Sequence, residues 1–138
     1  MRLVLDTDVL VAAVRSELGA SRKLLVGVLR ERVTLLATTA LFLEYEAVLR
    51  RPQHLRAVGM SVAEVDDILD GLANVVVPVE VVYRWRPQLI DAGDELVLEA
   101  AVNGRADRLV TFNIRHFAPA ERFGIRICRP GDVVGSWR

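Results

Sequence analysis

Short apolar runs alternate along the chain with longer segments of helical periodicity. Five runs are short, partly β-branched and bounded by polar or turn-forming residues, a pattern that predicts buried strands. They are residues 3–5, 33–37, 75–82, 108–111 and 125–128. Because Pro78 lacks an N–H to donate, the third of these strands is expected at an edge of its sheet.

Helices are predicted for most of the chain between these strands. Apolar residues that recur on one face, or almost all round, mark five segments. They are residues 9–14, 22–30, 38–50, 61–74 and 95–103. The boundaries have their own signals: a threonine cap at Thr38 or Thr39, a stop at Pro52, a capping box over Ser61–Glu64 and a stop at Gly104. Residues 84–93 are expected to form a polar connection.

The predicted order is β-α-α-β-α-α-β-α-β-β. Strands that alternate with helices indicate an α/β fold with three α/β/α layers, in which a mainly parallel central sheet is covered on both faces. In such sheets ligands bind at the carboxyl ends of the strands. The residues that directly follow each strand are therefore the first candidates for a functional site.

Length and composition restrict the classes of protein that remain. The chain has 138 residues, 52% of them hydrophobic and 26% charged, which fits one domain with a substantial core. Formal net charge is zero, so a protein that coats nucleic acid through overall basicity is excluded. The longest uncharged stretch, residues 33–43, is too short for a membrane span, and two aspartates among the first eight residues do not suit a signal peptide. We expect a cytoplasmic protein that makes no contact with a membrane.

Four predicted segments each place an acceptor side chain near the same edge of the sheet. Asp6 follows the first strand, Glu44 lies in the helix after the second, Asp94 opens the buried helix, and Asn113 follows the strand that ends at Thr111. Three carboxylates brought together repel one another, and a divalent cation would offset that repulsion. Oxygen ligands suit Mg²⁺ or Mn²⁺, and such ions promote phosphodiester hydrolysis.

Each of these residues also has an ordinary structural interpretation. Asp6 and Asn113 are typical turn residues, Asp94 is a typical helix N-cap, and Glu44 is compatible with a solvated helix face. The functional interpretation depends on all four lying at the same edge.

Four segments together resemble the PIN domain family, the ribonuclease fold found in VapC-type toxins of toxin–antitoxin systems. They are residues 3–12, with Asp6-Thr7; residues 40–52, with Glu44; residues 91–101, with Asp94; and residues 106–113, with Asn113. The resemblance extends to about Trp137 and implies a single PIN-like domain over residues 1–138. It implies that Asp6, Glu44 and Asp94 bind Mg²⁺ or Mn²⁺ and that Asn113 occupies a fourth, often acidic, catalytic position.

The resemblance also suggests residues that assist the site. Supporting roles fall to Thr7, Asp8, Glu95, Glu99 and Thr111. Contacts with RNA phosphates fall to Arg50, Arg51, Arg115 and His116, although surface or ion-paired positions explain the arginines equally well.

The function implied is that of a metal-dependent endoribonuclease, the toxin component of a type II toxin–antitoxin system. Its partners would be RNA, a small antitoxin protein and a second copy of the chain. Two alternatives remain open. The amide of Asn113 in place of an acid suggests a catalytically weak module that binds RNA or protein. Asp6-Thr7-Asp8 also resembles the start of a haloacid dehalogenase-type phosphatase, but the only lysine, Lys23, comes too early in the chain for that chemistry.

Overall fold

A computed structural model describes residues 1–83, 89 and 91–137 of the chain. In chain order the elements are β1 (Arg2–Leu5), α1 (Thr7–Arg15), α2 (Ala20–Leu29), β2 (Thr34–Ala37), α3 (Thr39–Leu49), α4 (Pro52–Val58), α5 (Val62–Val75), β3 (Val77–Pro78), α6 (Ala92–Asn103), β4 (Arg108–Val110), the 3-10 helix η1 (Ile114–Phe123), β5 (Arg126–Cys128) and α7 (Pro130–Val134). The predicted polar connection falls largely on residues 84–88 and 90, outside the described residues.

The five strands form one parallel sheet in the order β3-β2-β1-β4-β5. Strand β1 lies at its centre, and Leu3, Val4 and Leu5 are completely buried because both faces of the sheet are covered. The chain moves outward from β1 through β2 to β3 and then crosses to β4 and β5 on the other side. The strand order therefore reverses between β1 and β4, where doubly wound sheets bind ligands.

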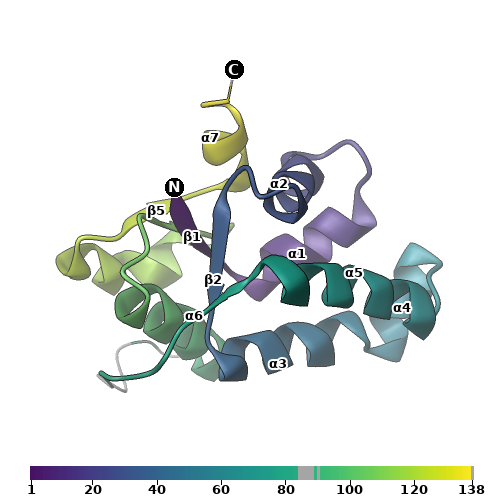
Figure 1. Cartoon of the computed structure of the whole chain (residues 1–138), viewed down its shortest axis with the longest axis horizontal. Coiled ribbons are helices and arrows are strands. Elements are labelled where there is room, and N and C mark those ends of the chain that lie inside the picture. Colours follow the sequence, from purple (N-terminus) through teal and green to yellow (C-terminus); the bar gives the residue numbers. More distant parts are fainter. Residues whose placement is uncertain (84–88, 90, 138) are drawn as a thin grey trace.

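Helices cover both faces of the sheet, which confirms the predicted three-layer fold. In Figure 1, α1 and α2 lie on one side of β1 and β2, whereas α6 lies on the other. Helix α6 packs against β1, β2 and β4, so its apolar residues are buried almost all round, as their pattern predicts.

Several boundaries differ from those predicted. Helix α3 ends before Pro52, as predicted, but Pro52 also occupies the first turn of α4, a helix that was not predicted. The missing N–H of proline is not needed in a first turn. Gly59 ends α4 with a left-handed φ of 69°. The strand predicted over residues 75–82 is wrong in extent, because β3 has two residues and Val75 belongs to α5. Pro78 does lie on an edge strand.

Two short elements near the C-terminus have no counterpart in the prediction. The 3-10 helix η1 carries Pro119 in its interior, a residue that argues against a regular helix in this segment. Helix α7 has five residues and begins at Pro130. In the part of the chain that the structure describes, no helix combines the length and apolar character that crossing a membrane requires.

Candidate active site

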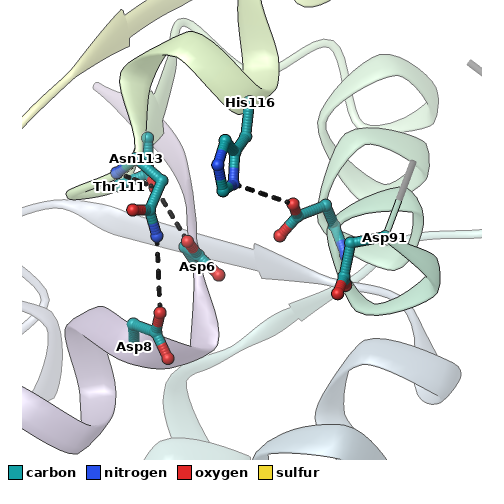
Figure 2. A network of polar contacts seen from close by, with 7 residues as sticks. Asp6, Asp8, Asp91, Thr111, Asn113 and His116 are labelled. Carbon is teal, nitrogen blue, oxygen red and sulfur yellow. Dashed lines mark hydrogen bonds and ion pairs between the residues drawn. The ribbon is translucent and has the colours of Figure 1, made fainter. Parts of the chain in front are cut away.

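The two central strands deliver Asp6 and Thr111 to the same edge of the sheet. Asp6 directly follows β1 and Thr111 directly follows β4, at the point where the strand order reverses. The backbone N–H of Asp6 donates to the carbonyl of Val110 at 2.9 Å, which continues the pairing of the two strands. The Thr111 hydroxyl then donates to Oδ2 of Asp6 at 2.7 Å (Figure 2). Residues far apart in sequence thus form one rigid contact.

Asp6 is a buried carboxylate with acidic neighbours. Only 5% of the residue is exposed. Burial, together with the charges of Asp8 and Asp94, raises the pKa of Asp6 to about 6, against the lowering effect of hydrogen bonds from Thr111 and from the Thr7 backbone. The predicted supporting residues Thr7, Asp8 and Thr111 therefore all act on Asp6.

Asn113 lies across from Asp8 at this edge. Its side-chain Nδ2 is 3.5 Å from Oδ2 of Asp8, and its backbone N–H donates to the Thr111 hydroxyl at 2.9 Å. Asp8 is exposed and lies in the first turn of α1, where no side-chain cap is made by the N-cap residue Asp6. Asp8 thus takes part in the polar network of the edge.

Asp94 approaches the site from the first turn of α6. Asp91 caps this helix by accepting the backbone N–H of Asp94 at 3.0 Å, so the interpretation of Asp94 as the N-cap is wrong. The helix begins earlier than predicted, and the Asp94 carboxylate is left to face His116, with 3.4 Å between Oδ2 and Nδ1 (Figure 2). Burial and the charge of Asp91 raise the pKa of Asp94, whereas His116 lowers it.

Glu44 is the predicted metal ligand that the structure does not join to this network. It lies partly buried in α3. Among the described residues, the carboxylates that raise the pKa of Asp6 are Asp8 and Asp94, and Glu44 is not one of them. Its neighbour Tyr45 is completely buried and donates a hydrogen bond from its hydroxyl to the carbonyl of Leu5, which ties α3 to the end of β1.

The two glutamates of α6 are more buried than a solvent-facing role would allow. Glu95 is 6% exposed and Glu99 is 8% exposed. Glu95 accepts the backbone N–H of Leu89, and the carbonyl of Glu99 accepts a hydrogen bond from Asn103. These contacts give both residues a part in holding the chain around α6.

The basic residues predicted to contact RNA differ in their surroundings. Arg50 forms an ion pair with Asp66, with 3.2 Å between Nε and Oδ1, so its charge is already matched within the fold. Arg51 is the exposed N-cap residue of α4, and Arg115 is exposed on η1. His116, next to Arg115, has a side chain that is 61% exposed. His116 borders the acidic edge directly through its contact with Asp94, and Arg115 precedes it on η1.

The donor chemistry of this edge fits a magnesium or manganese ion. Asp6, Asp8 and Asp94 offer only carboxylate oxygens, and their mutual repulsion is what a cation would relieve. Within the described ranges, no three His, Cys, Asp or Glu side chains converge closely enough to form a protein cage for a metal. Mg²⁺ does not require one, because it commonly binds through one or two carboxylates and keeps several waters.

Two residues at the site were missed by sequence reasoning. Asp91 positions Asp94, and the signal was present: an acidic residue three positions before another at the start of a helix is a typical cap arrangement. Tyr45 lies in the predicted helix over residues 38–50, and nothing in the sequence indicates that its hydroxyl meets the carbonyl of Leu5.

Comparison with known families supports the resemblance found in the sequence. A family model described as PIN domain matches residues 2–115, well over half of the chain. The matched span includes Asp6, Glu44, Asp94 and Asn113. No curated protein matches the chain significantly.

Proposed function

The chain belongs to the PIN domain family, whose members are generally nucleases, and we propose that it is a metal-dependent endoribonuclease with its active site at the carboxyl edge of the sheet. PIN nucleases generally use divalent metal ions and bind RNA. The family match makes the phosphatase interpretation of Asp6-Thr7-Asp8 unnecessary, because the same residues open the PIN fold.

One observation carries this proposal: a buried aspartate stands where two neighbouring carboxylates oppose its ionisation. The pKa of Asp6 is raised to about 6 by burial, Asp8 and Asp94, at the point where the strand order reverses. A fold gains no stability from such an arrangement, since burying like charges is unfavourable. A divalent cation reverses the balance, as expected of a site built to bind one.

The residues around the acidic edge have different parts in this mechanism. Asp6 and Asp94 would bind the ion, with Glu44 as a third ligand from α3, and the bound ion would supply an activated water and stabilise the charge of the leaving oxygen. Thr111 holds Asp6 in place through its hydroxyl. Asp91 orients the start of α6 and so presents Asp94 to the edge.

The substrate side of the site is formed by basic residues that lie next to the acidic edge. Arg115 and His116 follow Asn113 on η1 and are exposed, so they are the residues best placed to contact RNA phosphates. Arg51 offers a further charge at the start of α4. The ion pair with Asp66 makes Arg50 a weaker contributor.

The biological role we propose follows from the resemblance to VapC-type toxins. The protein would act in the cytoplasm as the toxin of a type II system, pair with a small antitoxin and form a homodimer. The segments that carry this resemblance are residues 3–12 and 40–52.

The decisive experiment is cleavage of an RNA pool, containing structured and single-stranded molecules, by the purified protein. Reactions contain Mn²⁺, Mg²⁺ or EDTA, and the variants Asp6→Asn and Asp70→Asn are purified identically. Asp70 is an exposed aspartate of α5 and serves as the matched control. We expect cleavage that needs metal, persists in Asp70→Asn and falls at least about 100-fold in Asp6→Asn, since loss of a metal ligand exceeds the effect of outer-shell changes.

A second candidate function is favoured by Asn113. Its amide faces Asp8 where many relatives carry an acid, so one negative charge fewer is available to a metal. A module that binds RNA with little catalysis is the function this would leave. Calorimetric titration with Mn²⁺ separates the two: an enzyme binds the ion through Asp6 and loses it in Asp6→Asn. RNA binding without any metal binding would reject the nuclease.

A further inference from the structure

Arginines gather at the other end of the sheet, in a pocket that the nuclease mechanism does not use. The pocket has a volume of about 710 Å³ and is lined by Arg105, Arg108 and Arg126. Arg108 begins β4 and Arg126 begins β5, so the pocket lies at the amino ends of these parallel strands. The acidic site lies at the opposite end of the sheet, where β1 and β4 end.

Two of these arginines are direct neighbours across the sheet. Arg108 and Arg126 are register partners in the parallel pair β4–β5, so their side chains leave the same face about 5 Å apart at the backbone. Like charges placed directly opposite each other destabilise a sheet. Arginine cannot lose its proton to relieve the repulsion, and the pair therefore favours a bound anion.

Asp107, the acidic residue that lines the pocket, does not neutralise these arginines. Asp107 accepts the backbone N–H of Arg2 through Oδ2 at 2.8 Å, which directs its carboxylate to the start of β1. In the described part of the chain, Arg105, Arg108 and Arg126 make no ion pair within 4.0 Å. The positive charge of the pocket is thus left for a ligand.

The shape and lining of the pocket indicate the class of that ligand. Its volume falls within the range of roughly 300–1,000 Å³ that small-molecule sites occupy. Guanidinium groups bind phosphate oxygens in a planar, two-pronged geometry. Phe123 and Ile125 line the pocket beside the arginines and provide apolar surface for the rest of a ligand.

We propose that this pocket binds a phosphate monoester of nucleotide size, with Arg108 and Arg126 holding the phosphate. The phosphate is carried either by a free nucleotide or by the 5′ end of an RNA. This site is separate from the acidic edge and does not depend on nuclease activity.

The test measures binding in EDTA, so that no metal bridges a phosphate to the acidic edge. Calorimetry uses AMP, a 5′-phosphorylated RNA trinucleotide, the same trinucleotide with a 5′-hydroxyl, and adenosine. The variants are Arg108→Gln, Arg126→Gln and, as a control, Arg56→Gln, an exposed arginine of α4. Thermal unfolding of each variant without ligand verifies that it folds.

The proposal predicts that the phosphorylated ligands bind and that adenosine and the 5′-hydroxyl RNA do not. Arg108→Gln and Arg126→Gln each weaken binding at least tenfold, whereas Arg56→Gln leaves it unchanged. Tighter binding of AMP assigns the pocket to free nucleotides, and tighter binding of the phosphorylated trinucleotide assigns it to RNA ends; both support a phosphate site.

A further readout does not rely on calorimetry. Without ligand, Arg126→Gln removes the repulsion with Arg108 and is expected to unfold at the same or a higher temperature than the wild type. AMP then raises the unfolding temperature of the wild type but not of this variant. Equal affinities in all three variants, or absence of binding by the phosphorylated ligands, would overturn the proposal whatever the RNA cleavage assay shows.

Discussion

The two ends of the central sheet differ in charge: acidic residues gather at one end and basic residues at the other. At the carboxyl edge, Asp6 has Asp8 and Asp94 as acidic neighbours. At the amino edge, Arg108 and Arg126 stand side by side on paired strands. The formal net charge of zero conceals this separation, because the two groups cancel in the sum although they lie at opposite ends of the fold.

The edges differ in how each can relieve its repulsion. Asp6 is 5% exposed and can accept a proton, which is why its pKa rises to about 6. Arg126 is exposed, and arginine stays charged at every accessible pH. An acidic cluster without metal is therefore sensitive to pH, whereas a basic cluster without an anion is sensitive to salt and to ligands. Each edge can be tested by the means to which it responds.

The largest effect on stability is expected from Asp6→Asn in metal-free protein. The pKa of Asp6 is 3.8 in its ordinary state and about 6 in the fold, so the native state holds a proton that the unfolded chain has lost between these values. Stability contributed by this group is present below about pH 4, falls as pH rises through this window, and is fully lost above about pH 6. The cost at neutral pH is on the order of 3 kcal/mol. Urea unfolding at pH 7.5 should show the variant to be more stable by up to this amount, and the difference should vanish near pH 4.

His54 also makes the stability of the protein depend on pH, so the free energies of unfolding of variant and wild type are compared at each pH. The residue is 4% exposed, and its ring nitrogens are the buried side-chain atoms of the described residues that lack a hydrogen-bond partner. Burial and the nearby charge of Arg15 lower its pKa, so acidification destabilises the fold through His54. This contribution is present in both proteins and cancels. A wild type at least as stable as Asp6→Asn at pH 7.5 would contradict the account of the acidic edge.

A smaller effect in the opposite direction is expected from Thr111→Val. The change keeps the shape of the side chain but removes the 2.7 Å hydrogen bond to Asp6 and leaves its buried carboxylate less well satisfied. It also removes the acceptor of the Asn113 backbone N–H. Hydrogen bonds to charged groups contribute about 1.5–3 kcal/mol, so we expect a loss of this size at pH 7.5. Because Thr111 lowers the pKa of Asp6, the variant should also lose stability over a window that extends to higher pH. An unchanged pH profile in urea unfolding would show that the bond does not tune Asp6.

At the basic edge, Asp107→Asn tests whether the carboxylate matters by its charge. An asparagine oxygen can still accept the Arg2 backbone N–H, so the fold keeps this contact while one negative charge leaves the pocket. We expect a loss of about 1 kcal/mol in low salt, because a charge-assisted bond becomes a neutral one. The loss should shrink in high salt, and a loss independent of salt would indicate a packing effect instead.

The smallest effect is expected from His116→Ala. The imidazole faces Asp94 at 3.4 Å, but its side chain is 61% exposed, and exposed pairs contribute roughly 0–1 kcal/mol. Its removal should barely change the unfolding midpoint while it raises the pKa of Asp94, which His116 lowers. Titration of the carboxyl carbons by NMR measures this shift directly. If Asp94 titrates as in the wild type, the contact does not persist in solution.

The fold could be predicted from the sequence where local pattern and tertiary environment agree. The run Leu3–Leu5 is apolar enough to be the central strand, and the capping box at Ser61 forms as its residue types indicate. The prediction failed where the chain is held by packing more than by its own pattern, as in η1 and the two-residue β3. Pro119 inside η1 argues against a helix there, and the two residues of β3 are too few to show an alternating pattern.

The candidate active site could be predicted from the sequence only in part. Placing Asp6 after β1 follows from the sequence, because parallel strands end at one edge. The position of Asp94 relative to Asp6 depends on where α6 begins, and Asp91 decides this by capping the helix. The role of Glu44 stays a prediction, since it is not among the described groups that shift the pKa of Asp6.

The sequence by itself determined the alternation of strands and helices and the acidic residues at their junctions, because hydrophobic periodicity and residue type act over a few neighbouring positions. Only the tertiary structure decided which charges meet. The contact of Thr111 with Asp6 and the pairing of Arg108 with Arg126 join residues from different strands. Their energies depend on burial and on distance through space, and neither quantity is written in the order of residues along the chain.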